Sequence, residues 1–328
     1  MSPFASTARA LRRDTAPDPH AEFAEAVLHG LSLPQKSLPC RFFYDERGSA
    51  LFEQITQLPE YYPTRTERAI LRDHAAEMAA DIAPGAVLVE LGSGSSLKTE
   101  TLLDALPGLA AYVCIDVSPS ALHDARNRLA ARYPALDIRP IVGDFSYPIA
   151  FPTDIAKRPR IGFFPGSTIG NLTPPEARDL LAGLPSQLTP GGRLIVGVDL
   201  RKDADTLLRA YNDSAGVTAA FNLNLLERIN RELGGKFDIA GFRHEAIYDP
   251  RQGRIEMHIV SRRAQEVVIR RRLFKFAAHE SIHTENSYKY SIEQFQALAH
   301  SAGWRPRRLW TDADQMFSVH ELDVLPVS

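Results

Sequence analysis

The pattern of apolar and polar positions predicts an α/β unit over much of the chain. Residues 86–91 form an apolar run apart from Glu90, and glycines follow at once. Similar runs predict strands over 112–117, 138–142, 161–164 and 194–198, with amphipathic helices between them over 98–106, 120–133 and 174–188. Strands that alternate with helices in this way predict a doubly wound parallel sheet.

After Leu200 this alternation stops. We predict helices over 204–212 and 219–233, then strands over 254–269 on either side of a polar turn at Arg262-Arg263. A helix returns over 291–302, opened by a Ser291/Gln294 capping box, and a hairpin over 308–322 follows. Because the interruption is far longer than an ordinary connection, it predicts an inserted domain. We assign 66–201 plus 290–328 to one domain, and 14–65 plus 202–289 to a second, substrate-binding α+β domain.

Composition narrows the class of protein. The 328 residues include 44% hydrophobic and 24% charged residues, which is ordinary for a globular protein of about two domains. A net charge of −2 disfavours bulk electrostatic binding to nucleic acid or membranes. Residues 1–20 lack the apolar segment of a secretory signal, and the two cysteines suit a reducing compartment. We therefore expect a cytoplasmic monomer without a metal, since no His/Cys cluster has ligand spacing.

The predicted strand ends carry groups suited to an adenosyl ligand. Gly92 and Gly94 follow the first strand and allow a tight turn close to a ligand. Leu97 stands where a dinucleotide fingerprint needs a third glycine, which disfavours NAD or FAD. Asp116 and Asp144 end the next two strands and can accept hydrogen bonds from ribose hydroxyls and an adenine amino group. Either could be only a helix cap, but together they favour an adenosyl pocket.

The end of the fourth strand is where amine methyltransferases place the reacting nitrogen. Here it reads Phe164-Pro165-Gly166-Ser167-Thr168-Ile169-Gly170-Asn171. It lacks the contiguous Asx-Pro-Pro-aromatic tetrapeptide of nucleic-acid amino-methyltransferases. Gly166 is therefore a candidate catalytic position for another class of amine.

Several further motifs occur in a specific order: 44–49 (Tyr-Asp-Glu-Arg-Gly-Ser), 58–67 (Leu-Pro-Glu-Tyr-Tyr-Pro-Thr-Arg-Thr-Glu), 90–94, 166–171 and 284–287 (Thr-Glu-Asn-Ser). From about residue 40 to the C-terminal hairpin, the chain closely resembles the histidine-specific α-N-methyltransferases of ergothioneine biosynthesis. The resemblance implies a Rossmann-like class I S-adenosylmethionine-dependent methyltransferase domain with a second α+β domain. It also implies three methyl transfers to the α-amine of L-histidine, giving hercynine (N,N,N-trimethylhistidine).

The same resemblance implies roles for individual residues. Tyr44 and Gly166 are the candidate catalytic residues; Gly92, Lys98, Asp116, Asp144 and Phe145 lie on the cofactor side; Tyr61, Asn171, Tyr211, Glu285, Asn286 and Ser287 lie on the histidine side. The chemistry suits these roles, since Asn171 and Tyr211 can donate to a carboxylate. Glu285, Ser287 and Tyr61 can pair with an imidazole, and an unpaired Glu285 rejects an apolar side chain.

Other interpretations stay open at this point. A methyltransferase for tryptophan or tyrosine shares the fold, although Glu285 disfavours it. A NAD-dependent oxidoreductase is disfavoured by Leu97, and a catalytically silent S-adenosylmethionine sensor by the set of polar residues on the substrate side. Without the resemblance, Tyr61-Tyr62-Pro63 is a packed aromatic turn, Met257 a core residue, and His283 a surface or hydrogen-bonded histidine.

Overall fold

The computed structural model describes residues 19–94, 96–188 and 192–325. The expectation about a secretory signal concerns mainly residues 1–18, which lie outside the described residues. Residues 14–18 and 326–328, at the outer ends of the two predicted domains, also lie outside them. No helix in the described ranges is long and apolar enough to cross a membrane.

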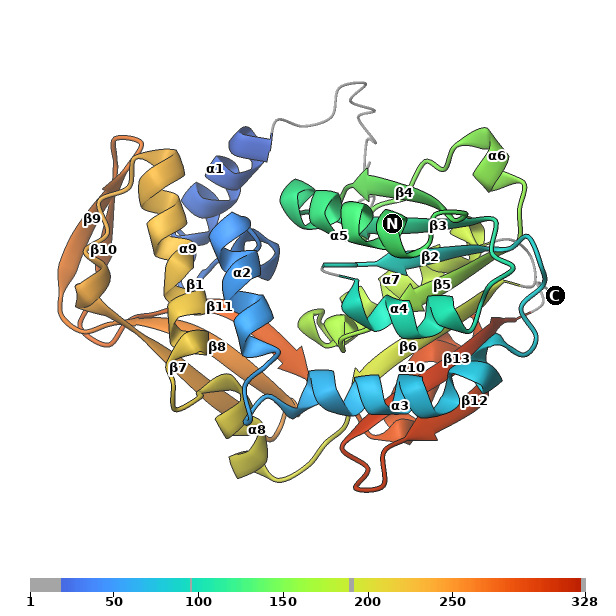
Figure 1. The fold of residues 1–328 in the computed structure, drawn as a ribbon. Helices are drawn as coiled ribbons and strands as arrows, with labels where there is room; N and C mark the ends of the chain where they lie inside the picture. The colour runs from blue at the N-terminus through green and yellow to red at the C-terminus, as the bar shows by residue number, and fades with distance from the viewer. Residues whose placement is uncertain (1–18, 95, 189–191, 326–328) are drawn as a thin grey trace, which may run out of the picture.

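The larger sheet has seven strands in the order β12-β13-β6-β5-β2-β3-β4 (Figure 1). They are β2 (Val87–Leu91), β3 (Ala111–Asp116), β4 (Asp137–Val142), β5 (Arg160–Phe164), β6 (Arg193–Asp199), β12 (Trp304–Thr311) and β13 (Phe317–Val324). Strands β2 to β6 run parallel, whereas β13 is antiparallel to β6 and to β12. Strand order reverses between β2 and β5, and in open α/β sheets ligands bind at the carboxyl ends beside such a point.

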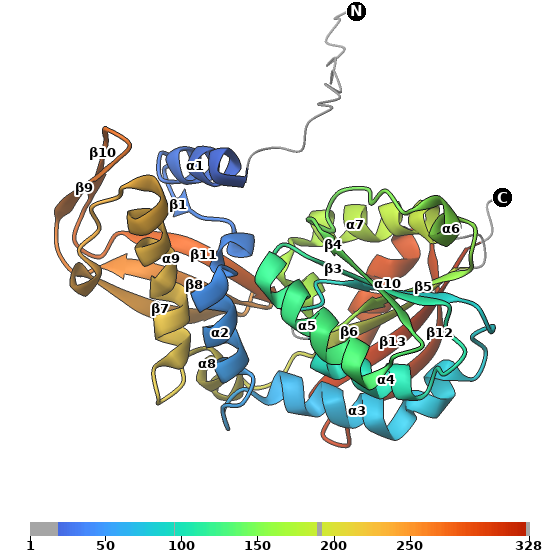
Figure 2. The same cartoon turned by 45° about the horizontal axis from the view of Figure 1, so that its top comes forward.

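Helices cover both faces of this sheet (Figure 2). One face carries α3 (Tyr62–Ala79), α4 (Leu97–Asp104) and α5 (Pro119–Arg132); the other carries α6 (Thr153–Ala156), α7 (Pro174–Gln187) and α10 (Ile292–Ser301). In β2, Val87, Val89 and Leu91 pack toward α7 and α10, and Leu88 packs toward α3 and α4. Burial on both faces explains why this strand reads as an almost continuous apolar run. The predicted α/β pattern over 86–200 is therefore confirmed, to within two residues at most ends.

The other half of the molecule is built on a second sheet, in the order β1-β11-β8-β7. Its strands are β1 (Lys36–Ser37), β7 (Phe242–Asp249), β8 (Arg254–Ser261) and β11 (Ser281–Tyr288). Helices α1 (Pro19–Gly30), α2 (Glu46–Ile55), α8 (Ala204–Tyr211) and α9 (Val217–Leu233) share one apolar core with it. The short 3-10 helices η1 (Cys40–Phe43) and η3 (Ile239–Gly241) also pack in this core, whereas η2 (Thr168–Asn171) follows β5 and packs in the core of the larger sheet. We call this the four-stranded half, and the rest the seven-stranded half.

The strands on either side of the Arg262-Arg263 turn belong to different sheets. Strand character over 254–269 is confirmed, but the two strands flanking the Arg262-Arg263 turn do not pair with each other. Strand β8 lies between β7 and β11, whereas β9 (Gln265–Ile269) pairs with β10 (Arg272–Phe276) in a separate hairpin. Strands β7 and β11 were missed because polar side chains interrupt their apolar pattern. Without these partners, the sequence alone could not assign the pairing of β8.

The N-terminal segment packs against the inserted helices through Asp45. Its carboxylate caps α2 by accepting from the Gly48 N–H at 2.7 Å. The same side chain accepts from Asn224 Nδ2 at 2.8 Å and Arg231 Nη2 at 2.5 Å, both on α9. One carboxylate therefore fixes the start of α2 and its contact with α9.

Replacing Asp45 should destabilise the protein more than replacing an isolated helix cap. We expect Asp45→Ala to lower the free energy of unfolding by about 2 kcal/mol, because a cap and the contact with Asn224 are lost together. Urea denaturation followed by circular dichroism measures this. Asp203→Ala is the matched control, because Asp203 caps α8 through the Thr206 N–H alone. Equal losses in the two variants would contradict the role of Asp45 between α2 and α9.

Candidate active site

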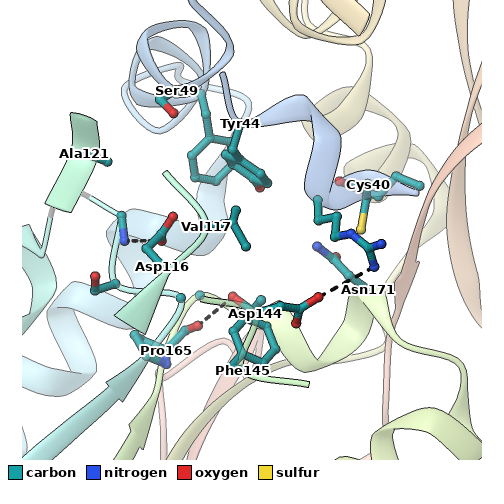
Figure 3. Close-up of a pocket in the computed structure, with 18 of the residues that line it drawn as sticks. Cys40, Tyr44, Ser49, Asp116, Val117, Ala121, Asp144, Phe145, Pro165 and Asn171 are labelled. Carbon is teal, nitrogen blue, oxygen red and sulfur yellow. Dashed lines mark hydrogen bonds and ion pairs between the residues drawn. The ribbon is translucent and has the colours of Figure 1, made fainter. Parts of the chain in front are cut away.

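A cavity of about 1310 Å³ lies between the two halves, at the carboxyl ends of the parallel strands. Figure 3 shows Tyr44 on one side of this space, with Asp144 and Phe145 opposite. The predicted site residues that line it are Tyr44, Tyr61, Gly92, Lys98, Asp116, Asp144, Phe145, Gly166, Asn171, Glu285 and Asn286. The other two, Tyr211 and Ser287, are buried and do not line it.

The turn after β2 is shaped by glycines. Gly92 and Gly94 have φ angles of +69° and +48°, in the left-handed region that glycine adopts without strain. A Cβ at Gly92 would lie 3.3 Å from Cε1 of Phe145, so a side chain there would press on that ring. Phe145 in turn packs edge-to-face on Phe164, with ring centroids 5.2 Å apart. The backbone and the aromatic ring therefore form a narrow wall of the cavity.

The two predicted aspartates have different surroundings. Asp116 accepts from the Gly94 N–H at 2.8 Å and the Ser118 N–H at 2.9 Å. Burial raises the pKa of Asp116, and these N–H groups oppose that rise. Asp144 accepts from the Ser146 N–H at 2.9 Å, and its other oxygen lies 3.6 Å from Arg41 Nη1 (Figure 3). Both carboxylates keep lone pairs for further donors.

Lys98 is held by a carboxylate that the sequence interpretation missed. Glu67 on α3 is only 1% exposed, and its Oε2 lies 2.6 Å from Lys98 Nζ. The Gly166 N–H donates to both Glu67 oxygens at 2.9 Å. A Cβ at Gly197 would lie 2.0 Å from Glu67 Oε1, so β6 needs glycine there. The available signal was a charged residue on the apolar face of a helix, three and four positions before Ile70 and Leu71.

The loop after β5 packs closely against the backbone of β11 in the four-stranded half. Ser167 Oγ accepts from the Asp199 N–H at 2.9 Å, at the end of β6. A Cβ at Gly170 would lie 2.8 Å from the Tyr288 carbonyl oxygen, so glycine lets η2 pack directly on the β11 backbone. Asn171 follows at the end of η2 and lines the cavity. The glycines of this motif therefore position the Asn171 amide.

A β-bulge in β11 sets the direction of Glu285. The register against β8 shifts between His283 and Glu285, so Thr284 and Glu285 are both buried. Thr284 Oγ1 donates to Asn222 Oδ1 at 2.8 Å, and both Thr284 and Glu285 line the cavity. Among the described residues none donates a hydrogen bond to that carboxylate. Burial raises the pKa of Glu285 to about 7, and the charge of Lys289 opposes the rise.

The other predicted substrate residues surround Glu285 at different depths. Tyr61 is 9% exposed, and its ring packs edge-to-face on Tyr211 at 6.1 Å. Behind it, Tyr211 OH and Ser287 Oγ lie 2.7 Å apart and share a hydrogen bond. Asn286 Oδ1 accepts a hydrogen bond from the His283 Nε2–H at 3.0 Å. His283 is therefore a hydrogen-bonded histidine at the cavity wall.

The family is shown by comparison with known proteins. A family model described as "Histidine-specific methyltransferase, SAM-dependent" matches residues 23–324. The chain belongs to this family. It is 44% identical over 317 residues to the histidine N-alpha-methyltransferase of Mycolicibacterium smegmatis, covering 94% of this chain and 92% of that one. The corresponding protein of Mycobacterium tuberculosis is 42% identical over 299 residues, with coverage of 89% and 92%.

A fungal relative extends the comparison. Ergothioneine biosynthesis protein 1 of Neurospora crassa is 32% identical over 299 residues, which cover 88% of this chain and 33% of that protein. The seven-stranded order, with its antiparallel β13 between β6 and β12, is the Rossmann-like class I methyltransferase fold. Fold and family therefore agree.

Removing the charge of Asp116 should weaken binding of S-adenosylmethionine. We expect Asp116→Asn to bind it at least about tenfold more weakly, because the ribose hydroxyl that Asp116 is predicted to bind would lose a charged acceptor. Isothermal titration calorimetry measures the dissociation constant. Asp124→Asn is the control, since Asp124 is an exposed residue of α5 that lines the same cavity. If both variants bind like the unmodified protein, Asp116 does not contact the ribose.

Proposed function

We propose that the protein transfers three methyl groups from S-adenosylmethionine to the α-amino group of L-histidine, giving hercynine, the first step of ergothioneine biosynthesis. Family membership and the relatives from mycobacteria support the histidine N-alpha-methyltransferase activity. The observation that carries the choice of substrate is the buried carboxylate of Glu285, which faces the cavity without a hydrogen-bond donor from the described residues.

The cofactor half of the cavity suits an adenosyl group. Asp116 would accept from the ribose hydroxyls, and Asp144 from the adenine amino group, while Phe145 would pack on the ring. Lys98, held by Glu67, presents a cation suited to the carboxylate of the methionyl part. Gly92 leaves room for the ligand to approach the backbone. When bound, S-adenosylmethionine supplies an electrophilic methyl group on its sulfonium.

The substrate half suits a polar aromatic amino acid. Glu285 would accept the imidazole N–H, and this pairing would compensate for burying its charge. The Asn171 amide, positioned by the close packing of η2 on β11, would donate to the substrate carboxylate. An indole N–H or a phenol O–H could also donate to Glu285, but these side chains are larger than imidazole and have no second ring nitrogen to pair with a neighbouring hydroxyl. This contrast supports histidine over tryptophan or tyrosine.

Tyr44 would lie beside the substrate amine, where we expect it to orient the amine and not to lose its own proton. The amine must lose a proton before each transfer, because an ammonium has no lone pair. Burial raises the pKa of Tyr44 well above 10, and the nearby charge of Glu285 raises it further. Tyr44 therefore stays a neutral phenol that can hydrogen-bond the amine nitrogen. Gly166 leaves space beside Lys98, where the substrate nitrogen and the methyl group would meet. Alignment of this nitrogen with the methyl group would supply much of the rate acceleration.

The direct test is mass spectrometry of L-histidine incubated with the purified protein and S-adenosylmethionine. We expect a trimethylated histidine to accumulate, whereas tryptophan and tyrosine in parallel reactions stay unmodified. Methylation of another amino acid instead of histidine would keep the fold and cofactor but refute the assigned substrate. If S-adenosylmethionine binds and no amino acid is methylated, the protein is a sensor rather than an enzyme.

Neutralising Glu285 should affect histidine more than the cofactor. We expect Glu285→Gln to lower kcat/KM for histidine by about tenfold or more at pH 8, because a charge-assisted hydrogen bond to the ring is lost. The KM for S-adenosylmethionine should stay the same. Because protonation below pH 7 removes the same acceptor, the unmodified enzyme should lose kcat/KM for histidine as pH falls through about 7.

The control for this variant is Glu46→Gln, which removes another carboxylate from the cavity wall at the start of α2. It should leave kcat/KM for histidine within about twofold, because a partly solvated charge interacts weakly at a distance. Initial rates by coupled assay of S-adenosylhomocysteine give these values. Equal effects of the two substitutions would show that Glu285 acts only through the overall charge of the cavity.

A further inference from the structure

A buried lysine lies directly behind the proposed histidine subsite. The side chain of Lys289, the residue after β11, is 0% exposed, and its ammonium lies 2.7 Å from Oδ2 of Asp199 at the end of β6. Its Nζ also lies 2.8 Å from Ser287 Oγ and 3.0 Å from Tyr211 OH. The sequence analysis assigned no role to this residue, and the cavity itself does not include it.

The protons of this cluster can be assigned by counting donors. An ammonium has three protons and no lone pair, so Lys289 donates to Asp199, Ser287 and Tyr211 and is then fully used. Both hydroxyl oxygens therefore accept from Lys289. They also share one hydrogen bond with each other at 2.7 Å, which uses only one of their two protons. The pair is left with one hydroxyl proton directed away from Lys289, whichever oxygen carries it.

The charges of the cluster point to Glu285 as the missing counter-charge. Asp199 binds two ammonium groups, because Lys202 Nζ lies 2.7 Å from its Oδ1. Asp199 is therefore shared between two lysines, and the charge of Asp312 also acts on Lys202. Glu285, Ser287 and Lys289 follow each other at every second residue, the spacing of side chains on one face of a strand. An ionised Glu285 supplies a further counter-charge on the side of Lys289.

We propose that Lys289 is a positioning residue that sets the selectivity for histidine, by keeping Glu285 ionised and by holding the Ser287 and Tyr211 hydroxyls in one donor arrangement. This inference rests on the proposed function, in which Glu285 accepts the imidazole N–H. Lys289 touches neither substrate and acts through these three side chains. A neutral residue at this position leaves a protonated Glu285, which no longer presents an anionic acceptor to the ring.

The other groups that face Glu285 cannot replace this charge. They are Cys40 beside η1, Tyr44 after η1, Tyr61 at the start of α3, and Tyr211 on α8. Burial raises the pKa of each of these four, and the charge of Glu285 raises it further, so all four are neutral near pH 7. Lys289 is the cation whose charge lowers the pKa of Glu285 against the effect of burial.

The test compares pH profiles of kcat/KM for histidine in the full-length enzyme and in Lys289→Met. Removing the ammonium raises the pKa of Glu285, so the acidic limb of the profile should move to higher pH by about one unit or more. At pH 7 this lowers kcat/KM for histidine by about fivefold or more, because the ionised fraction of Glu285 falls from about one half to about one tenth. The titration of free histidine is the same for both enzymes and cancels in the comparison. The KM for S-adenosylmethionine should not change.

Three further variants separate this role from a general effect on folding. Lys202→Met removes the other cation from Asp199 but makes no contact with Ser287 or Tyr211, so its acidic limb should stay in place. Lys289→Arg keeps the charge, so the acidic limb of its profile should lie close to that of the unmodified enzyme. In a Glu285→Gln background, Lys289→Met should no longer shift the profile. If Lys289→Met does not fold, Lys289→Gln provides the same comparison.

The possible results lead to different conclusions. A shifted limb in Lys289→Met but not in Lys202→Met supports the proposal. An unshifted limb, or an equal loss of affinity for histidine and S-adenosylmethionine, overturns it and leaves Lys289 a structural residue. These results require that the unmodified enzyme methylates histidine; if it does not, the proposed function has failed instead, and the first mass spectrum shows this separately.

Discussion

The buried carboxylate of Asp199 is the interaction on which the relative placement of the two halves depends. It accepts from Lys289 and Lys202, and from the Tyr62 hydroxyl at 2.8 Å. Burial alone would raise the pKa of Asp199, but the two ammonium groups outweigh it, and the pKa lies below its ordinary value. These groups come from the end of β6, the start of α3 and the end of β11. An unpaired charge here would be costly, so the cluster specifies one arrangement of these segments.

Backbone contacts extend this junction. Tyr290 and Leu200 form a parallel bridge, and the Arg201 N–H donates to the Tyr290 carbonyl at 3.0 Å. The Ser167 hydroxyl receives the Asp199 N–H, which connects the junction to the loop that carries Gly166 and Asn171. Because the cavity is lined by both halves, the distance between the cofactor residues and Glu285 is set here. Alignment of nitrogen and methyl group therefore depends on residues that touch neither ligand.

Burial gives the carboxylates of the site different tasks. Glu67 is paired with Lys98 and the Gly166 N–H, so it shapes the cofactor side without facing it. Glu90 lies at the first turn, where burial raises its pKa to about 8 and Thr99 and Tyr112 both donate to its Oε2. Glu285 lines the cavity and receives no hydrogen bond from the described residues. This supports the proposal that Glu285 pairs with the substrate side chain.

Local periodicity and the direction of each strand were enough to predict the parallel sheet, the glycine turn after β2 and the acidic residues at the ends of β3 and β4. The family motifs also identified Glu285 and Asn171 as candidates, while their roles and the domain boundaries stay predictions. Contacts between distant segments, visible only in the folded chain, pair Glu67 with Lys98, place Tyr211 and Ser287 behind the cavity wall, and bring Lys289 to Asp199. A buried charge needs a partner to offset its desolvation, and here that partner is distant in sequence, so no local pattern reveals it.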